Sequence, residues 1–406
     1  MRSGSSRSAV VGALLAAFAV VPSSSVRSAG APGAAPAEAG TYLVYVGTYT
    51  GGKSEGIYRF TFDAETGRAS SVALAAKIDS PSFLALHPGG RFLYAVNEPQ
   101  GRAAAGGAVS AFRIAGAEGD LEFLNSESSG GAAPCHIAID RRGTHAFAAN
   151  YGSGSVVLLP IGADGRLGAR TACIAHEGSG ADQARQRGPH AHCVNLDAGN
   201  RFLLVADLGI DKIVVYRFDA AAGTLAAQAL VALAPGAGPR HLAFSPDERF
   251  VYAVNELDLT VTRFAYTAAT GALQAKESVS TLPVPRQAGF SAAEIAVHPS
   301  GRFLYASNRG HDSIAAFAVD KEAGALRAIG HVPAGGRTPR HFALDPSGAW
   351  LLCAHQSSDT IAVFRVDRET GLLAPGGAAI KVPSPVCVLF RGQSPISHGE
   401  IGDCPR

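Results

Sequence analysis

Ionisable side chains recur at one position of a pattern that repeats along the chain. The pattern is a short apolar run, a turn with Gly or Pro, a second run that often begins Arg-Phe, and a final Asn or Asp, as in residues 188–208. Imidazoles transfer protons near neutral pH, and guanidiniums bind carboxylates, phosphates and oxyanions. Aligned on the turn, each repeat has one residue at this position, near the start of the first run. The seven residues are Ser82, Cys135, His192, Arg240, Ala293, Arg340 and Val386.

Two neighbouring positions of the pattern also carry polar groups. The next residue of the first run is Phe83, His136, Cys193, His241, Glu294, His341 or Cys387. The residue directly after the second run is Glu98, Tyr151, Leu208, Glu256, Arg309 or Gln356. For any single residue, an alternative role is to bond turn carbonyls at a strand end. Because different repeats supply different charged groups, the set favours a shared site for a small polar or anionic ligand.

The longest strongly polar segment between two runs is residues 176–189, HEGSGADQARQRGP. It leads directly into His190 and His192. Loops held by a rigid scaffold commonly carry binding groups. We expect this loop to cover the opening at which the three positions converge.

The elements that position these groups are strands. After residue 37, short β-branched or aromatic runs alternate with Gly, Pro, Asp and Asn, and no long stretch has helical periodicity. Each repeat has four runs, and the chain has seven of each type. The first runs are 81–86, 134–139, 190–196, 239–244, 292–297, 339–344 and 385–390, and the second are 42–48, 91–97, 144–150, 201–207, 249–255, 302–308 and 350–355. Third runs include those that begin near residues 56, 212, 313 and 360. Fourth runs begin near Arg68, Leu121, Leu167, Leu225, Leu273, Leu326 and Leu373.

The two ends of the array are complementary. Residues 42–48 form a second run with no first run before it, and residues 384–390 form a first run with no second run after it. Four antiparallel strands repeated at this spacing are typical of a propeller blade. The sequence therefore predicts an all-β fold, a seven-bladed β-propeller whose C-terminal strand joins the N-terminal blade. A two-domain β-sandwich would have no reason to carry complementary half-repeats.

Composition narrows the class of function. With 406 residues, 47% hydrophobic and 17% charged, the chain can bury a large core. A net charge of +2, with basic residues scattered through turns and strand ends, argues against nucleic-acid binding. The six cysteines lack metal-ligand spacing, and most of them lie in apolar runs as expected of buried thiols. We therefore expect no metal and no cofactor.

The N-terminal segment differs from the rest of the chain. Arg2 and Arg7 precede the apolar residues 9–21, and an Ala-Pro-Ala sequence ends at Ala37. This is the pattern of a secretory signal, and the apolar run is shorter than the roughly 20 residues that span a bilayer. We predict a signal peptide and linker over 1–37, the propeller over 38–395 and a tail over 396–406. The expected location is the periplasm, without stable membrane association after cleavage; a disordered leader or an uncleaved anchor is the alternative.

Residues 41–392 resemble the seven-bladed propeller lactonases of the 6-phosphogluconolactonase type, which are related to carboxy-muconate lactonizing enzymes. The resemblance rests on YVGTYTGGKSEGIY, HEGSGADQARQRGPHAHCV, GPRHLAFSPDERFVYAVNE and ASNRGHDSIAAF. It implies that His192, Arg240, Glu256 and Arg309 are catalytic, and that Arg185 belongs to the site. Family members are commonly cytosolic and use phosphorylated lactones. A secretory signal departs from this pattern, so the resemblance alone does not imply that the substrate is phosphorylated.

Three functions are consistent with the sequence. The first is hydrolysis of a sugar-derived lactone, with Glu256 or His192 as general base and with Arg240 and a second arginine stabilising the oxyanion. The second is a cyclising reaction of the muconate type, and the third is a non-catalytic propeller that binds a ligand or protein on its rim. The expected partner is a small-molecule lactone, and the oligomeric state is left open. Further substrate-binding candidates are Arg185, His190, Arg340, Glu98, Tyr151 and His136.

Overall fold

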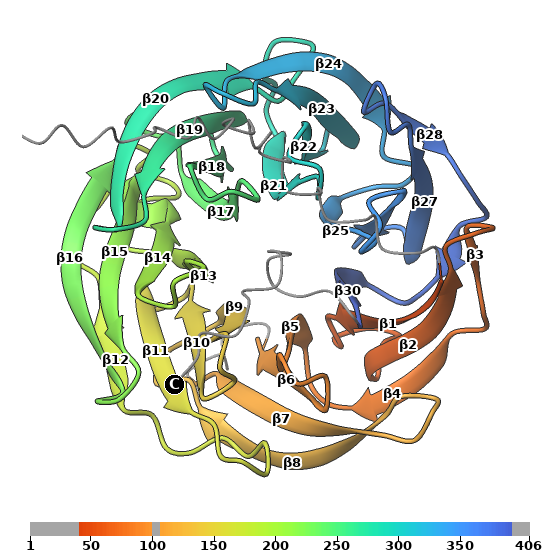
Figure 1. Ribbon diagram of the computed structural model, residues 1–406, viewed down its shortest axis with the longest axis horizontal. Helices are drawn as coiled ribbons and strands as arrows, with labels where there is room; N and C mark the ends of the chain where they lie inside the picture. The colour runs from red at the N-terminus through yellow and green to blue at the C-terminus, as the bar shows by residue number, and fades with distance from the viewer. Residues whose placement is uncertain (1–39, 100–105, 392–406) are drawn as a thin grey trace, which may run out of the picture. The chain divides into compact units, whose positions relative to one another are not determined.

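The strands of the chain form seven radial sheets (Figure 1). The computed structural model describes residues 40–99 and 106–391, all of which belong to the second of the two units into which the chain divides, residues 37–406. The predicted signal segment and linker and the whole predicted tail, including Cys404, lie outside the described residues. Within the described ranges, no helix is both long and apolar enough to cross a lipid bilayer.

Each sheet has an inner strand that faces the central channel and a second strand paired antiparallel to it. The inner strands are β5 (Pro81–Leu86), β9 (Pro134–Ile139), β13 (Ala191–Leu196), β17 (Pro239–Phe244), β21 (Ser291–Val297), β25 (Pro339–Leu344) and β30 (Pro385–Phe390). Their partners are β6 (Phe92–Asn97), β10 (His145–Asn150), β14 (Phe202–Asp207), β18 (Phe250–Asn255), β22 (Phe303–Arg309), β26 (Trp350–His355) and β1 (Thr41–Thr48).

Two further layers complete each blade. The third strands are β7 (Ala108–Ala115), β11 (Ser155–Pro160), β15 (Lys212–Asp219), β19 (Thr260–Thr267), β23 (Ser313–Val319), β27 (Thr360–Val366) and β2 (Gly56–Asp63). Five blades have one continuous outer strand: β8 (Asp120–Ser128), β12 (Ala172–Ala175), β16 (Thr224–Ala232), β20 (Ala272–Ser280) and β24 (Leu326–Pro333). In the other two blades the outer strand is split into two short strands. These are β28 (Leu373–Pro375) with β29 (Ile380–Lys381), and β3 (Arg68–Ala69) with β4 (Ala73–Lys77). The only helix within the described residues is the short η1 (Leu208–Ile210).

The ring closes as the sequence predicts. Strand β30 pairs antiparallel with β1, with Val44 opposite Phe390 and Val46 opposite Val388. Each inner strand contacts the inner strand of the next blade, including β30 with β5. The seven-bladed propeller with four antiparallel strands per blade is therefore confirmed.

One outer strand begins later than the sequence predicts. The fourth run was expected near Leu167, but β12 begins at Ala172, and Leu167 forms only an isolated bridge with Ile161. The reason is a side chain from the neighbouring blade. Asn125 accepts from the Leu167 N–H at 3.0 Å and donates to the Leu167 carbonyl at 2.7 Å, so both backbone groups are already bonded.

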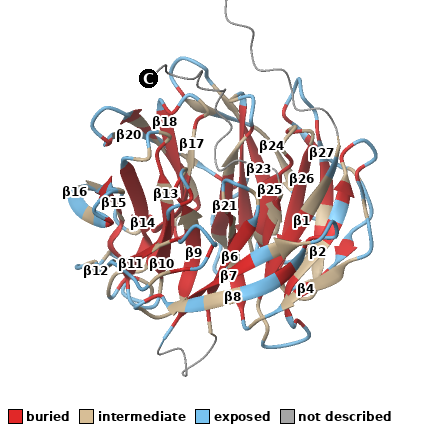
Figure 2. Cartoon of the chain, turned by 60° about the horizontal axis from the view of Figure 1, so that its bottom comes forward, coloured by how far each residue is buried: buried red, intermediate tan, exposed pale blue. Residues whose placement is uncertain are grey.

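The apolar core lies between adjacent blades, and exposure increases toward the outer strands (Figure 2). A repeated hydrogen bond joins the blades: the hydroxyls of Tyr45, Tyr94, Tyr252 and Tyr305 donate to glycine carbonyls at 2.8–3.0 Å. At the closing seam, Leu352 stands at the tyrosine position, and the indole N–H of Trp350, two residues earlier, donates to the Ala64 carbonyl at 2.8 Å. The inner strands are thus held on a rigid frame.

Candidate active site

Every inner strand is irregular at the position that sequence alignment places at the channel mouth. In six strands the ladder skips one residue: Ser82, Cys135, His192, Arg240, Arg340 or Val386. In β21 the shift takes in both Ala293 and Glu294. A β-bulge frees a residue from strict alternation and re-aims its side chain. The aligned position is therefore a ring of bulges.

Glu256 lies at the centre of a cluster of arginines. Its Oε1 accepts from Arg185 Nη2 at 2.6 Å, and its Oε2 accepts from Arg240 Nε at 3.1 Å. Arg309 Nη2 lies 2.8 Å from the same Oε2. Burial alone would raise the pKa of Glu256, but Arg309, Arg240 and Arg185 lower it to about 2. The carboxylate is therefore a weak base that holds three guanidinium groups in place.

Arg240 is the most deeply buried of these cations, with 2% of its surface exposed. Its Nη1 donates to the Ala293 carbonyl at 2.6 Å and to His241 Nε2 at 3.2 Å. Burial, with help from Arg309 and Arg340, lowers the pKa of Arg240 to about 10. The guanidinium therefore stays charged at neutral pH.

His192 lies beside this cluster as a neutral imidazole. It is buried, and its ring contacts the rings of Tyr151 and His241 with centroids 5.5 and 5.2 Å apart. Its Nδ1 lies 3.8 Å from Cys135 Sγ. Burial, followed by the charges of Arg240 and His241, holds the pKa of His192 well below its ordinary value. A neutral imidazole can accept a proton at physiological pH.

A second cluster contains Glu98, Arg340 and Tyr49. The Tyr49 hydroxyl donates to Glu98 Oε2 at 2.9 Å and accepts from Arg340 Nη2 at 2.9 Å. The Arg340 guanidinium also lies over the Tyr49 ring, 5.3 Å from its centroid. Burial raises the pKa of Glu98. Tyr49 is missing from the sequence prediction, although it directly follows the second run 42–48 just as Glu98 follows the run 91–97.

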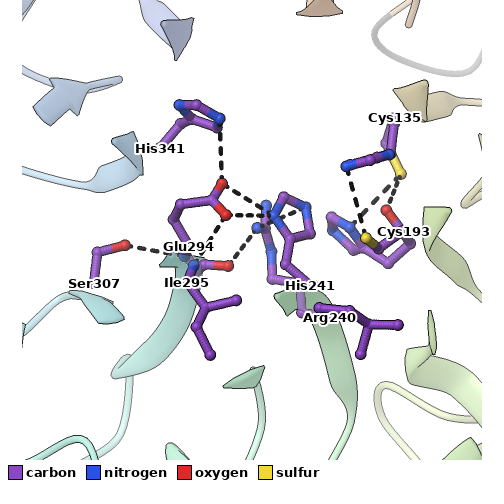
Figure 3. A network of polar contacts seen from close by, with 12 residues as sticks. Cys135, Cys193, Arg240, His241, Glu294, Ile295, Ser307 and His341 are labelled. Atoms are coloured by element: carbon purple, nitrogen blue, oxygen red, sulfur yellow. Dashed lines mark hydrogen bonds and ion pairs between the residues drawn. The ribbon is translucent and has the colours of Figure 1, made fainter. Parts of the chain in front are cut away.

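The residues that directly follow the bulge position in the inner strands lie below the mouth and form its floor. His241 Nδ1 lies 3.0 Å from both oxygens of Glu294, and His341 Nε2 lies 3.4 Å from Oε2 (Figure 3). Phe83 packs against three floor histidines, His136, His241 and His341, with centroids 4.1 to 5.7 Å apart. The sequence alignment contained His241 and Glu294 but gave no reason to prefer them over their neighbours.

The polar loop carries Arg185 to the rim. The side chain of Gln186 is fully buried and donates to the Leu208 carbonyl at 2.7 Å and to Asp211 Oδ1 at 2.6 Å. Arg185 then bonds Glu256 and, at 3.3 Å, the Tyr151 hydroxyl. His190 stacks on the Tyr151 ring at 4.5 Å, and its Nδ1 donates to the Tyr151 carbonyl at 2.9 Å.

The structure brings most of the predicted residues together. His192, Arg240, Glu256, Arg309 and Arg185 form one connected group, which Tyr151 and His190 border. Arg340 and Glu98 form the second cluster, whereas His136 lies in the floor and lines the space beyond it. Within the described ranges, no set of three or more His, Cys, Asp or Glu side chains has a geometry that would hold a metal ion.

This arrangement can bind an anion and transfer a proton. Four arginines face two carboxylates, Glu98 and Glu256, at the mouth. The surplus of positive charge favours a phosphate, a carboxylate or an oxyanion formed during reaction. His192 supplies the neutral imidazole.

Comparison with known proteins gives a consistent assignment. Residues 43–390 match the family model "Lactonase, 7-bladed beta-propeller". A 6-phosphogluconolactonase of Bacillus subtilis is 37% identical over 87% of this chain and 99% of the relative, and one of Formosa agariphila is 36% identical over 74% and 85%.

Solved structures agree. A putative 6-phosphogluconolactonase from Bacteroides fragilis superposes with a TM-score of 0.80 at 37% identity, covering 86% of this chain and 98% of the other. The periplasmic gluconolactonase PpgL of Pseudomonas aeruginosa superposes with a TM-score of 0.82 at 33% identity, covering 86% and 99%.

Proposed function

The chain belongs to the seven-bladed β-propeller lactonase family, and from this premise we propose that it hydrolyses a sugar-derived lactone to the open aldonic acid. The observation that carries the proposal is the placement of a buried, neutral imidazole beside a guanidinium cluster at one channel mouth. His192 is the candidate base, and Arg240 and Arg309 are the candidate oxyanion partners.

The contacts of His192 indicate which nitrogen is free. A carbonyl oxygen only accepts, so the Cys135 thiol donates to the His192 carbonyl, 3.4 Å away. The sulfur then accepts from Nδ1–H at 3.8 Å, which leaves Nε2 without a proton. We assign Nε2 the role of accepting a proton from the attacking water.

The reaction then needs two proton movements. Water adds to the lactone carbonyl carbon as His192 takes its proton, and the arginines stabilise the resulting oxyanion. The bond from the carbonyl carbon to the ring oxygen breaks, and the ring oxygen receives the proton from the imidazolium. The products are a hydroxyl and a carboxylic acid on one open chain, and the acid then releases its proton to water to become the carboxylate. Glu256 holds the arginines in this scheme, because guanidinium groups already bond both of its oxygens.

The substrate is an anionic or strongly polar sugar lactone. The arginine surplus at the mouth would pair with a phosphate or with the carboxylate formed on opening. Relatives are named both 6-phosphogluconolactonase and periplasmic gluconolactonase. Together with the signal pattern, the second name supports an exported, periplasmic enzyme that acts on an aldonolactone with or without phosphate.

The exposed side chains do not favour a non-catalytic propeller that binds a protein partner on its rim. The exposed large apolar residues within the described ranges are Phe123, Leu230, Val284 and Leu372, and they lie on different blades. A protein-binding rim would gather such residues into one patch.

The test is hydrolysis by the purified protein. Gluconolactone and 6-phosphogluconolactone are offered separately, and acid release is compared with spontaneous opening. We expect acceleration of at least one, and loss of that acceleration in the double variant His192→Ala, Glu256→Gln. No acceleration by the wild-type protein, or an unchanged rate in the double variant, would contradict the proposal; conversion of a carboxy-muconate instead would support the cyclising alternative.

A further inference from the structure

The guanidinium of Arg240 is bonded on two of its three nitrogens. Nε donates to Glu256 at 3.1 Å, and Nη1 donates to the Ala293 carbonyl at 2.6 Å and to His241 Nε2 at 3.2 Å. Among residues 40–99 and 106–391, no partner is found for Nη2. Three of the five N–H groups are therefore fixed by protein, and the two on Nη2 remain for a ligand.

The bond from Arg240 determines the tautomer of His241. A guanidinium only donates, so His241 Nε2 has to accept and carries no proton. The ring proton is then on Nδ1, which faces the two oxygens of Glu294 at 3.0 Å. Arg240 and Glu294 thus select the same neutral tautomer from opposite sides of one ring.

Glu294 is surrounded by donors. His341 Nδ1 accepts from the Val388 N–H at 3.2 Å, so the proton of His341 is on Nε2, which lies 3.4 Å from Glu294. The backbone N–H of Ile295 donates to the same carboxyl at 2.9 Å. Figure 3 shows Glu294 between His341 and His241. Burial raises the pKa of Glu294, but every neighbour with an assigned proton donates to it, which requires the ionised form.

We propose that Glu294 and His241 are positioning residues that fix the direction of the Arg240 guanidinium, so that Nη2 points at the substrate. This inference rests on the proposed lactonase function and adds two residues to it. Neither residue is assigned contact with the substrate. Their effect passes through a chain of hydrogen bonds from carboxylate to imidazole to guanidinium.

The surroundings of His241 keep this chain in one state. The charged and titratable groups around His241 are Arg240, Arg340, Arg309, Glu256, Glu294, His136, His192 and His341. Burial, Arg240 and Arg340 hold the pKa of His241 well below its ordinary value, although Glu256 raises it. A second proton would place Nε2–H against the cationic guanidinium and break the bond, so the alignment is maintained throughout the neutral range.

Two substitutions at His241 separate positioning from packing. In His241→Gln, the side-chain oxygen reaches the place of Nε2 and still accepts from Arg240. In His241→Asn, the amide reaches only the place of Nδ1, so the bond to Glu294 survives and the bond to Arg240 is lost. We expect kcat/KM to fall about a hundredfold in His241→Asn and about tenfold or less in His241→Gln, mainly through kcat.

Glu294→Gln tests the other end of the chain. Its amide offers His241 Nδ1 a donor as well as an acceptor, so only the bond from Arg240 still selects the tautomer. Nitrogen-15 NMR of the imidazoles should show Nδ1–H at His241 in the wild-type protein and a mixture of the two tautomers in this variant. His298→Gln is the control, because His298 is buried and bonds the Gly348 carbonyl at 2.9 Å away from the mouth.

Binding of 6-phosphogluconate, measured by calorimetry, separates this inference from the proposed function. We expect the affinity order wild type, then His241→Gln, then His241→Asn. Equal losses in the two His241 variants, or a wild-type protein with Nε2–H at His241, would overturn the positioning role alone. If the wild-type protein opens no lactone but the binding order and the tautomer hold, the proposed function fails and the positioning role stands.

Discussion

The two ends of the channel are built from the same seven strands and differ in almost every other respect. At the mouth, each inner strand has a bulge, and the freed residues include His192, Arg240 and Arg340. At the opposite end the strands pair regularly, and apolar residues such as Leu86, Ile139 and Phe244 line a cavity of about 590 Å³. The larger cavity reaches the floor residues His136, Glu294 and His341 and also contains Arg141 and Asp345, but the arginine cluster lies at the mouth.

The difference shows how a repeated fold acquires a site. Regular alternation presents the same kind of side chain from every blade, which suits packing. A bulge costs one unpaired residue and allows each blade to present a different group. The blades therefore present different chemical groups at the mouth, while the frame that the tyrosine hydroxyls hold together is the same from blade to blade.

The largest effect should come from the base at the mouth. His192→Gln keeps the volume and polarity of the side chain but removes the proton acceptor, so we expect kcat to fall about a thousandfold with little change in KM. Steady-state kinetics on the better of the two lactones measures this. A fall of less than about tenfold would assign proton transfer to another group, with Glu98 the next to test because burial raises its pKa.

Replacing one arginine at each end of the channel tests the difference between the two ends directly. Arg240→Met at the mouth should lower kcat/KM about a hundredfold or more, because Nη2 is lost while Glu256 keeps Arg185 and Arg309. Arg141→Met, at the residue that lines the opposite cavity, should change kcat/KM by less than about twofold. Equal effects of the two substitutions would remove the functional distinction between the ends.

The buried histidines of the mouth and the floor should make stability dependent on pH. Burial lowers the pKa of His136, His192 and His241 well below the ordinary value and that of His341 to about 4. The unfolded chain binds these protons from about pH 6.5 downward, so the free energy of unfolding falls as pH decreases below that value. Glu98 and Glu294 act in the opposite direction, because burial raises their pKa values, but they are fewer.

His136→Asn isolates one of these contributions. Its side-chain oxygen can still accept from the Val194 N–H, which His136 Nδ1 does at 3.4 Å. Between pH 6 and 5 we expect the slope of unfolding free energy against pH to decrease by about 1.4 kcal/mol per pH unit, measured by urea unfolding. An unchanged slope would mean that His136 is protonated in the folded protein.

The smallest effect on activity should come from the apolar end. Ile137 is buried and lines the large cavity. Ile137→Ala should lower the free energy of unfolding by about 2–4 kcal/mol and leave kcat/KM within about twofold. Thermal unfolding and kinetics on the same preparation measure both. A large loss of activity without a loss of stability would place this cavity on the substrate's path.

The fold could be predicted from the sequence because strand boundaries depend on local features. Turn residues and alternating runs located all seven inner strands to within a residue or two of their bounds. The exception, Leu167, is instructive: its backbone is bonded by Asn125 from another blade, a contact that no local pattern contains.

The sequence predicted that these polar residues lie near one channel mouth, but it did not predict their hydrogen bonds or their pKa shifts. Alignment placed Glu256 at the mouth, yet its weak basicity depends on contacts with Arg309, Arg240 and Arg185, the last of which lies in a separate loop. His241 and Glu294 matter through ring orientation and hydrogen-bond direction, and these are properties of the packed structure. Tyr49 was missed although its position in the repeat was available.

The pairing of β1 with β30 also determines when the site comes into existence. Val44 and Phe390 are neighbours in space but lie far apart in the sequence, so one blade lacks its inner strand until residues 385–390 have been synthesised. Until then β1 presents an open edge. Tyr49 and Arg340, which meet across this seam, come together only when the last strand docks, and a chain truncated before residue 385 would have six complete blades but an unfinished mouth.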